Sequence, residues 1–205
     1  MIAGVLKLSR KDVLALRVKD AYSLHRIIYG LFDATLGEAE KKLDAGSGFL
    51  FADKGGTSAC RQILFLSDRA PRIPEFGELC IKKIPDSFLL HDDYTFEVVV
   101  NPVYKASKTE KRLPVKGREA ISEWFVKRAE SSWGFSVAAE GLEVKQVRVQ
   151  QFEKKGCRVT LQQALIKGRL HVTDREKFRS SFERGIGKGR AFGCGLLQIV
   201  PIFHH

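Results

Sequence analysis

The stretch GIGKGRAFGCG, residues 185–195, decides how the second half of this 205-residue chain folds. It places two Gly-hydrophobic-Gly pairs around a basic centre that contains Lys188 and Arg190. Glycine lets backbone amides approach a phosphate and allows positive φ where a turn needs it. A helical pattern (174–184) precedes this glycine-rich loop, and an apolar run (196–202) follows it as an expected strand. That order reverses a dinucleotide-binding fingerprint, and no G-x-G-x-x-G or GK[ST] register fits, so we expect no nucleotide cofactor.

Length and composition predict a folded, soluble protein. The chain is 44% hydrophobic, which suffices for one large domain or for two of about 100 residues each. No apolar run approaches the roughly 20 residues that cross a bilayer, and the N-terminus lacks a secretory pattern. We therefore predict a cytoplasmic protein with no membrane partner. His204 and His205 resemble the start of an affinity tag, and we leave them out of the fold prediction.

The cysteines and histidines do not form the pattern of a metal site. The four cysteines lie far apart, without a C-x-x-C pair, at Cys60, Cys80, Cys157 and Cys194. We interpret them as reduced thiols rather than as a disulfide framework or a zinc ribbon. The histidines within the expected fold are His25, His91 and His171, and no cluster of histidines and carboxylates accompanies them. We expect neither a metal nor another cofactor.

The positive charge is confined to the second half of the chain. Residues 1–100 carry 14 lysines and arginines against 14 aspartates and glutamates. Residues 101–205 carry 21 against 10, which accounts for the whole net charge of +11. A basic half joined to a neutral half is typical of a polyanion-binding surface on one part of a molecule, although a solvated basic face without a partner has the same composition.

The order of elements predicts an α+β fold with two tandem ferredoxin-like (RRM-like) domains, residues 1–88 and 89–203. Expected strands are 1–9, 48–52, 61–66, 78–84, 94–104, 142–153, 157–172 and 196–202, and expected helices are 21–32, 117–133 and 174–184. Asp20 is placed to cap the first helix, and the TDRE sequence at 173–176 is typical of a capping box. The second helix of the first domain is weakly marked.

The first helix carries two opposed stripes. Leu24, Ile27, Ile28 and Leu31 have the i, i+3, i+4, i+7 spacing of a core-facing stripe. Tyr22, His25, Arg26 and Tyr29 have the same spacing and point the other way, so we expect them to face outwards within reach of one another. A lone histidine is more often a structural residue than a catalytic one, and spacing alone leaves both interpretations open.

Several segments together resemble the CasE branch of CRISPR-associated repeat-processing endoribonucleases. The matching segments are Asp20–His25 (D-x-Y-x-L-H), Tyr29–Phe32, Gly48–Phe51, Tyr94–Phe96, Asn101-Pro102, Lys111–Val115 and the glycine-rich loop. They follow the family's order over most of the chain. The Asn-Pro strand end and the double glycine pattern are specific mainly in combination, and residues 33–46 match nothing in the family pattern.

The resemblance implies a function and an active site. It implies a metal-independent endoribonuclease that cuts CRISPR precursor RNA 3′ of the repeat hairpin, with Tyr22 and His25 as the catalytic pair. Attack by the RNA 2′-hydroxyl would give a 2′,3′-cyclic phosphate (or 3′-phosphate) and a 5′-hydroxyl. The implied partners are the repeat hairpin RNA, the mature crRNA and the other subunits of a Cascade-type complex. Some relatives also use a lysine, which the sequence does not identify here.

The expected RNA-binding residues are mostly basic and gather in three places: after the Asn-Pro strand end, on the long hairpin and in the glycine-rich loop. They are Arg26, Lys105, Lys108, Lys111, Arg112, Arg148, Lys154, Lys155, Arg158, Gly185, Gly187, Lys188, Arg190, Gly193 and Gly195. Lys145 and Arg148 have opposite parity on a regular strand, so they share a face only if a bulge lies between them. Trp124 and Trp133 are expected in the core.

Two other functions remain open at this point. The first is a non-catalytic RNA-binding subunit of a CRISPR complex, which would keep the basic half but have no use for Tyr22 and His25. The second is a general polyanion-binding domain, which would show no preference for hairpin RNA.

Overall fold

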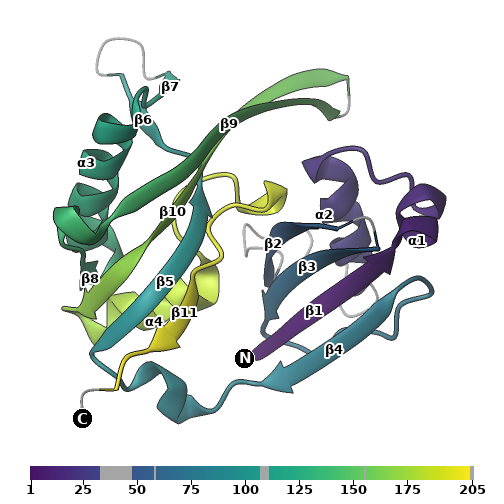
Figure 1. Ribbon diagram of the computed structural model, residues 1–205, viewed down its shortest axis with the longest axis horizontal. Helices are drawn as coiled ribbons and strands as arrows, with labels where there is room; N and C mark the ends of the chain where they lie inside the picture. The colour runs from purple at the N-terminus through teal and green to yellow at the C-terminus, as the bar shows by residue number, and fades with distance from the viewer. Residues whose placement is uncertain (33–47, 58, 107–110, 155, 204–205) are drawn as a thin grey trace, which may run out of the picture. The chain divides into compact units, whose positions relative to one another are not determined.

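The computed structural model describes residues 1–32, 48–57, 59–106, 111–154 and 156–203 (Figure 1). The chain divides into two compact units. Unit 1 comprises Met1–Pro85 with Ala191–Gly193, and unit 2 comprises Asp86–Arg190 with Cys194–His205. In the part of the chain that the structure describes, no helix is long and apolar enough to cross a membrane.

The described residues of unit 1 form a four-stranded antiparallel sheet with two helices. Its elements are β1 (Ile2–Ser9), α1 (Arg10–Ala15), α2 (Ala21–Gly30), β2 (Phe49–Gly56), β3 (Cys60–Ser67) and β4 (Glu78–Lys83). The strand order is β2-β3-β1-β4. The ferredoxin-like plan has a second helix between the third and fourth strands, but the described residues 68–77 form a loop there.

The helices of unit 1 begin at side-chain caps. Asp20 accepts a hydrogen bond from the Ser23 backbone N–H at 2.7 Å and starts α2, as the sequence predicts. Ser9 and Asp12 form a capping box that starts α1, a helix the sequence analysis did not predict. Leu6 and Leu8, which alternate with less buried neighbours on β1, are fully buried and pack in one core with α2.

Unit 2 contains a second ferredoxin-like sheet and a long hairpin. Its main elements are β5 (Asp93–Val100), α3 (Arg118–Arg128), β8 (Phe135–Ser136), β9 (Glu143–Lys154), β10 (Cys157–Val172), α4 (Arg175–Arg184) and β11 (Gln198–Pro201). Its described residues also form the short strands β6 (Val103–Lys105) and β7 (Arg112–Pro114) and the short helical turns η2 (Asp86–Leu89), η3 (Ala129–Trp133) and η4 (Ala139–Gly141). A further turn, η5 (Arg190–Phe192), has Arg190 in unit 2 and its other two residues in unit 1. The strand order is β11-β5-β10-β8, with β9 paired to β10, and β6 and β7 form a separate two-stranded ribbon. Both units thus have the predicted α+β, ferredoxin-like strand order.

Aromatic side chains fill the core of unit 2. Tyr94, Phe96, Val98 and Val100 alternate along β5 and are buried. Phe96 stacks on Phe125 of α3 with ring centroids 5.5 Å apart. Trp133, in the π turn η3, is buried as predicted, whereas Trp124 is half-buried and donates from Nε1 to the Val103 carbonyl at 3.2 Å.

The structure corrects two details of the sequence prediction. The single strand expected over residues 94–104 is divided into β5 and β6 at Asn101-Pro102, because proline has no N–H to donate to a strand partner. The capping box expected at Thr173 is wrong. The N-cap of α4 is Asp174, whose carboxylate accepts from the Lys177 backbone N–H at 3.0 Å, while the Thr173 amide donates to the Gly134 carbonyl.

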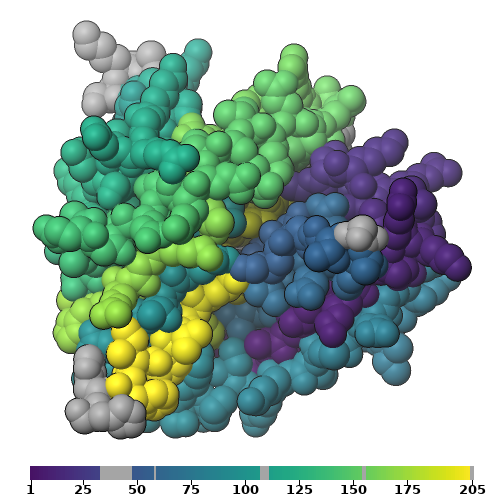
Figure 2. Space-filling model, viewed as in Figure 1, coloured from purple at the N-terminus to yellow at the C-terminus, as the bar shows by residue number. Residues whose placement is uncertain are grey.

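The hairpin of β9 and β10 extends past the sheet of unit 2. Strand β5 pairs with β10 only from Ala164 to His171, so the segment Cys157–Gln163 pairs with β9 alone. Figure 1 shows this end of the hairpin as a curved two-stranded arm. In Figure 2 the side chains of β9, in green, lie at the surface.

Candidate active site and nucleic-acid interface

The two stripes of α2 (Ala21–Gly30) are buried to different extents. Leu24, Ile28 and Leu31 of the apolar stripe are at most 5% exposed and belong to the core of unit 1. On the other stripe only Arg26 is exposed, while Tyr22, His25 and Tyr29 are half-buried. The expectation that this whole stripe faces solvent is therefore wrong.

His25 lies among aromatic rings. Its ring centroid is 5.9 Å from those of Tyr29 and Phe49 and 6.4 Å from that of Phe51. Phe49 and Phe51 come from β2, which the sequence pattern did not connect with His25. The aromatic neighbours limit the rotamers open to the imidazole while leaving it partly exposed.

Tyr22 lies one turn before His25 on α2. Residues three apart on a helix are surface neighbours, so the phenol and the imidazole emerge on the same side of α2. Arg26 follows His25 directly and adds an exposed positive charge beside them. The helix thus combines an imidazole, a phenol and a guanidinium on one side.

The glycine-rich loop is held to the sheet of unit 2 by backbone hydrogen bonds. The Gly195 amide donates to the Val99 carbonyl at 2.7 Å, and the Ile186 amide donates to the Gly195 carbonyl at 3.0 Å. Lys188 forms an isolated antiparallel bridge with Asn101 at the end of β5. The Asn-Pro strand end and the glycine pattern, which are far apart in sequence, therefore meet in the fold.

The glycines of the loop serve two different needs. A Cβ on Gly195, where φ is +85°, would lie 2.4 Å from the Ile186 carbonyl oxygen, so no other residue fits without displacement. A Cβ on Gly187, where φ is +71°, would meet nothing within 4 Å. Gly193 and Gly195 are buried and Gly185 and Gly187 are half-buried, whereas Lys188 and Arg190 are exposed. Of the loop residues predicted to bind RNA, the two cations are therefore more exposed than the glycines.

The cations of the hairpin lie on opposite faces. Arg148 is opposite Gln163 in the β9–β10 register, and its Nε donates to the Gln163 Oε1 at 2.9 Å. Arg158 is opposite Glu153 and donates to Gln151, on the other face. The predicted hairpin cluster is therefore divided. Lys154 ends β9, and Lys155 lies outside the described residues.

A bulge does lie between Val144 and Gln146. The register shifts between Leu165 and Ile166, which leaves Lys145 as the extra residue. Lys145 forms an ion pair with Glu143, the residue opposite Lys167 on the Arg148 face of the hairpin. The condition under which Lys145 and Arg148 share a face is thus met.

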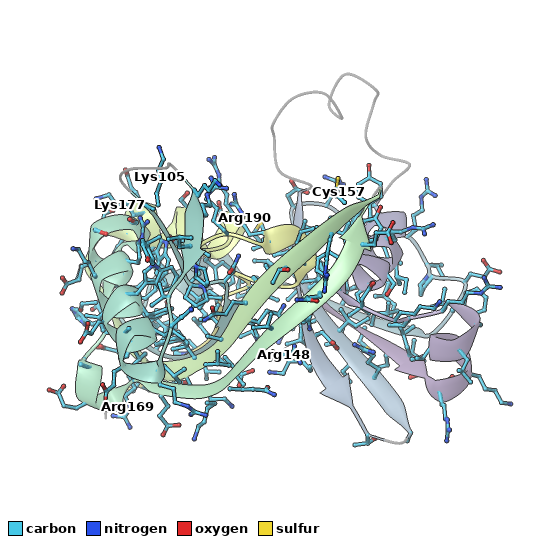
Figure 3. All side chains as sticks on the ribbon, turned by 90° about the horizontal axis from the view of Figure 1, so that it is seen from above. Lys105, Arg148, Cys157, Arg169, Lys177 and Arg190 are labelled. Carbon is cyan, nitrogen blue, oxygen red and sulfur yellow. The ribbon has the colours of Figure 1, made fainter. Side chains whose placement is uncertain are left out.

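The third basic group lies on the ribbon of β6 and β7. Lys105 and Arg112 are opposite each other in its register, and both are exposed. Lys111 is exposed next to Arg112, and Lys108 lies outside the described residues. Figure 3 shows Lys105 at this ribbon, Arg148 on the hairpin and Arg190 in the glycine-rich loop.

Comparison with protein families matches residues 5–201 to the family described as "CRISPR associated protein". The chain belongs to this family. It is 25% identical over 193 residues to the CRISPR system Cascade subunit CasE of Escherichia coli, covering 90% of this chain and 94% of that protein. It is 30% identical over 117 residues to the CRISPR-associated endoribonuclease Cse3 of Thermus thermophilus, covering 52% of this chain and 54% of that protein.

A solved structure of the CRISPR endoribonuclease Cse3 bound to a 19-nucleotide RNA shares the fold. The TM-score is 0.82, and the superposition covers 98% of this chain and 100% of that chain at 21% identity. The fold that the sequence predicted is therefore the fold of a known CRISPR-associated protein.

In this member of the CRISPR-associated family, sequence reasoning missed the buried polar residue Gln163. Gln163 is 4% exposed, and its Nε2 donates to the Cys194 Sγ at 3.6 Å. Cys194 is fully buried, and this burial raises the pKa of its thiol to about 12, so it stays protonated at neutral pH. In the β10 pattern, Gln163 lies between Leu161 and Leu165 on one face, and a polar residue in an apolar row was the available signal.

Within the described ranges, no three His, Cys, Asp or Glu side chains group in a way that could hold a metal ion. His171 and Asp93 lie together at the surface, with the His171 Nδ1 3.0 Å from an Asp93 carboxylate oxygen.

Proposed function

We propose that this chain is a metal-independent endoribonuclease that cleaves CRISPR precursor RNA on the 3′ side of the repeat hairpin. The observation that carries the proposal is the position of His25, half-buried among aromatic rings beside Tyr22, in a chain that matches the CRISPR-associated family over residues 5–201. A relative named as an endoribonuclease supports the reaction class, and one named as a Cascade subunit supports a role in a Cascade-type complex.

The reaction needs no external nucleophile, because RNA carries one. A base removes the proton of the 2′-hydroxyl, and the 2′-oxygen attacks the adjacent phosphorus. The bond from phosphorus to the 5′-oxygen breaks, and the leaving oxygen takes up a proton. The products are a 2′,3′-cyclic phosphate, which can open to a 3′-phosphate, and a 5′-hydroxyl.

The residues of α2 suit this chemistry. Histidine titrates near neutrality, so His25 can take the proton from the 2′-hydroxyl or give one to the leaving oxygen, a role that typically contributes about 10²–10⁴-fold. The phenol of Tyr22 can donate a hydrogen bond to the scissile phosphate or orient the 2′-hydroxyl. Arg26 can stabilise the extra negative charge of the phosphorane.

The basic second half supplies the affinity for RNA. A-form RNA hides its base edges in a deep, narrow groove, so a protein recognises it through phosphates, groove shape and unpaired flanks. Lys188 and Arg190 in the glycine-rich loop, Arg148 on the hairpin, and Lys105 and Arg112 on the ribbon are the exposed cations we assign to phosphate contacts.

The proposal extends to the steps after cleavage. The protein keeps the mature guide RNA bound after cutting and joins the other subunits of a Cascade-type complex, in the cytoplasm. A non-catalytic RNA-binding subunit is the second candidate, because the basic hairpin and the glycine-rich loop suit it equally. The difference between the two lies in whether Tyr22 and His25 are needed for anything beyond folding.

The test is cleavage of the repeat RNA from the protein's own genome in excess EDTA. Wild type is expected to cut, whereas His25→Ala is expected to bind the RNA without cutting. A substrate with a 2′-deoxynucleotide at the cut site should resist wild type. His91→Ala is a matched control, because His91 also packs against aromatic rings, those of Tyr94 and Phe203, and it should cut normally. Tight hairpin binding without cleavage by wild type would leave only the non-catalytic candidate.

A further inference from the structure

A buried amide connects the hairpin with the glycine-rich loop. Gln163 on β10 accepts from the Arg148 Nε at 2.9 Å and donates to the Cys194 Sγ at 3.6 Å. The orientation of the amide is fixed by chemistry, because the guanidinium of Arg148 can only donate and must meet the amide oxygen. The amide nitrogen is thereby directed at the thiol, which is protonated at neutral pH and can accept through its sulfur.

The bond to Arg148 is suited to orienting a cation for RNA. It engages Nε, which fixes the plane of the guanidinium group while its two terminal amino groups can still donate to a bidentate acceptor such as a phosphate. A long arginine side chain otherwise samples many rotamers, and ordering it on binding reduces affinity. The hydrogen bond to Gln163 already restricts the Arg148 side chain in the protein without RNA.

The glycine-rich loop lies over the face of β10 that carries Gln163. A Cβ on Gly189 would lie 3.1 Å from the Leu161 Cδ1 and 3.4 Å from the Cys194 Sγ, so the loop backbone lies directly over this face of β10. Leu161 and Gln163 share that face, and Arg148 is on the same face of β9. Lys188 precedes Gly189 and is exposed. The amide therefore lies beneath a surface that carries both cations.

We propose that Gln163 is a positioning residue for RNA binding, which holds Arg148 in register with the glycine-rich loop so that Arg148 and Lys188 meet the phosphates of one RNA hairpin together. This inference rests on the proposed function. Gln163 itself does not touch the RNA, since it is 4% exposed. Its contribution is expressed through Arg148, and it should disappear when Arg148 is removed.

The test is a double-mutant cycle on RNA affinity. The probe is the repeat RNA with 2′-deoxynucleotides at the cut site, and its Kd is measured over a series of KCl concentrations for wild type, Gln163→Met, Arg148→Met and the double variant. Each single variant is expected to raise the Kd about tenfold or more and to lower the slope of log Kd against log salt by about one charge. The double variant should bind no more weakly than Arg148→Met alone.

Gln162→Met is the matched control. Gln162 is the adjacent residue of the same type, but it points to the other face and donates to the Val115 carbonyl at 2.7 Å. It should lower the melting temperature by a similar amount and leave the salt slope unchanged. If Gln163→Met does not fold, Gln163→Asn replaces it, because its amide is one methylene too short to reach both partners and should give the same loss of slope.

Two results would overturn the inference. One is a Gln163 variant with the salt slope of wild type, and the other is an additive effect of the Gln163 and Arg148 substitutions. Either result leaves the proposed function intact, because wild type would still bind and cut the RNA. Failure of wild type to bind hairpin RNA would instead refute the proposed function and this inference together.

Discussion

Replacing Phe49 by leucine tests whether the aromatic rings around His25 position it for catalysis. Phe49 is 7% exposed and stacks on Phe32 at 5.2 Å and on His25 at 5.9 Å. Leucine fills most of the volume but removes the ring contacts, each of which is worth about 0.5–1.5 kcal/mol. We expect the contact between Phe49 and His25 to favour the productive rotamer of His25. Losing about 0.5–1.5 kcal/mol of this preference should lower the cleavage rate about 2- to 12-fold.

The assay is single-turnover cleavage with enzyme in excess over RNA, which removes product release from the rate. Phe65→Leu is the matched control, because Phe65 is also buried in unit 1 and packs edge-on against Phe32 at 5.8 Å. Both variants should lower the melting temperature, but only Phe49→Leu should cut more slowly. Equal losses of rate in the two variants, or a wild-type rate for Phe49→Leu, would refute the positioning role of the ring.

Three further predictions concern stability and reactivity. In a denaturant titration, Gly195→Ala should lower the free energy of unfolding by more than about 2 kcal/mol, because φ is positive and the new Cβ would lie 2.4 Å from the Ile186 oxygen. Gly187→Ala, where φ is also positive but the Cβ would meet nothing, should lower it by about 1 kcal/mol. The exposed thiols of Cys80 and Cys157 should react with a disulfide reagent at pH 8 in the folded protein, whereas Cys194, whose pKa burial raises to about 12, should react only on unfolding. The backbone hydrogen bond from Lys177 lowers the pKa of Asp174. The ionised carboxylate therefore stabilises the fold at neutral pH, and this stabilisation is lost as the pH falls through the lowered pKa. Asp174→Ala should reduce the melting temperature more at pH 7 than at pH 2.

The sequence predicted features whose cause is local. The Asp20 cap and the apolar stripe with Leu24 and Ile28 depend on residues within one or two helical turns, and β9 and β10 pair from residues close in sequence, Lys154 and Cys157. The sequence did not predict the bulge at Lys145. It showed only that Lys145 and Arg148, three residues apart, need a bulge between them to share a face, and not whether or where the strand has one.

The surroundings of His25 could not be predicted from spacing. Its neighbours Phe49 and Phe51 lie more than 20 residues later, and the side of the helix that β2 covers is a property of the tertiary fold. Gln163 was missed for a related reason. A glutamine in a strand usually marks the solvent face, but here Gln163 is 4% exposed and contacts Cys194, which is 31 residues later. The helix α1 was missed because it has six residues and no buried side chain to create a periodic pattern.

In the glycine-rich loop, the glycines that make the sequence pattern have a structural role, and the charge is carried by other residues. Gly195 is required because the Ile186 carbonyl leaves no room for a side chain, and Gly189 lies close over Leu161 and the Cys194 sulfur. These glycines let the loop backbone pack against β10. The conformational entropy lost in ordering the loop is therefore lost on folding and not on ligand binding. Lys188 is then displayed from a fixed backbone rather than from a flexible one, so its charge acts at a defined distance from the sheet. The glycines therefore determine where the charge of Lys188 lies, and the phosphate contact we propose for it depends on that position.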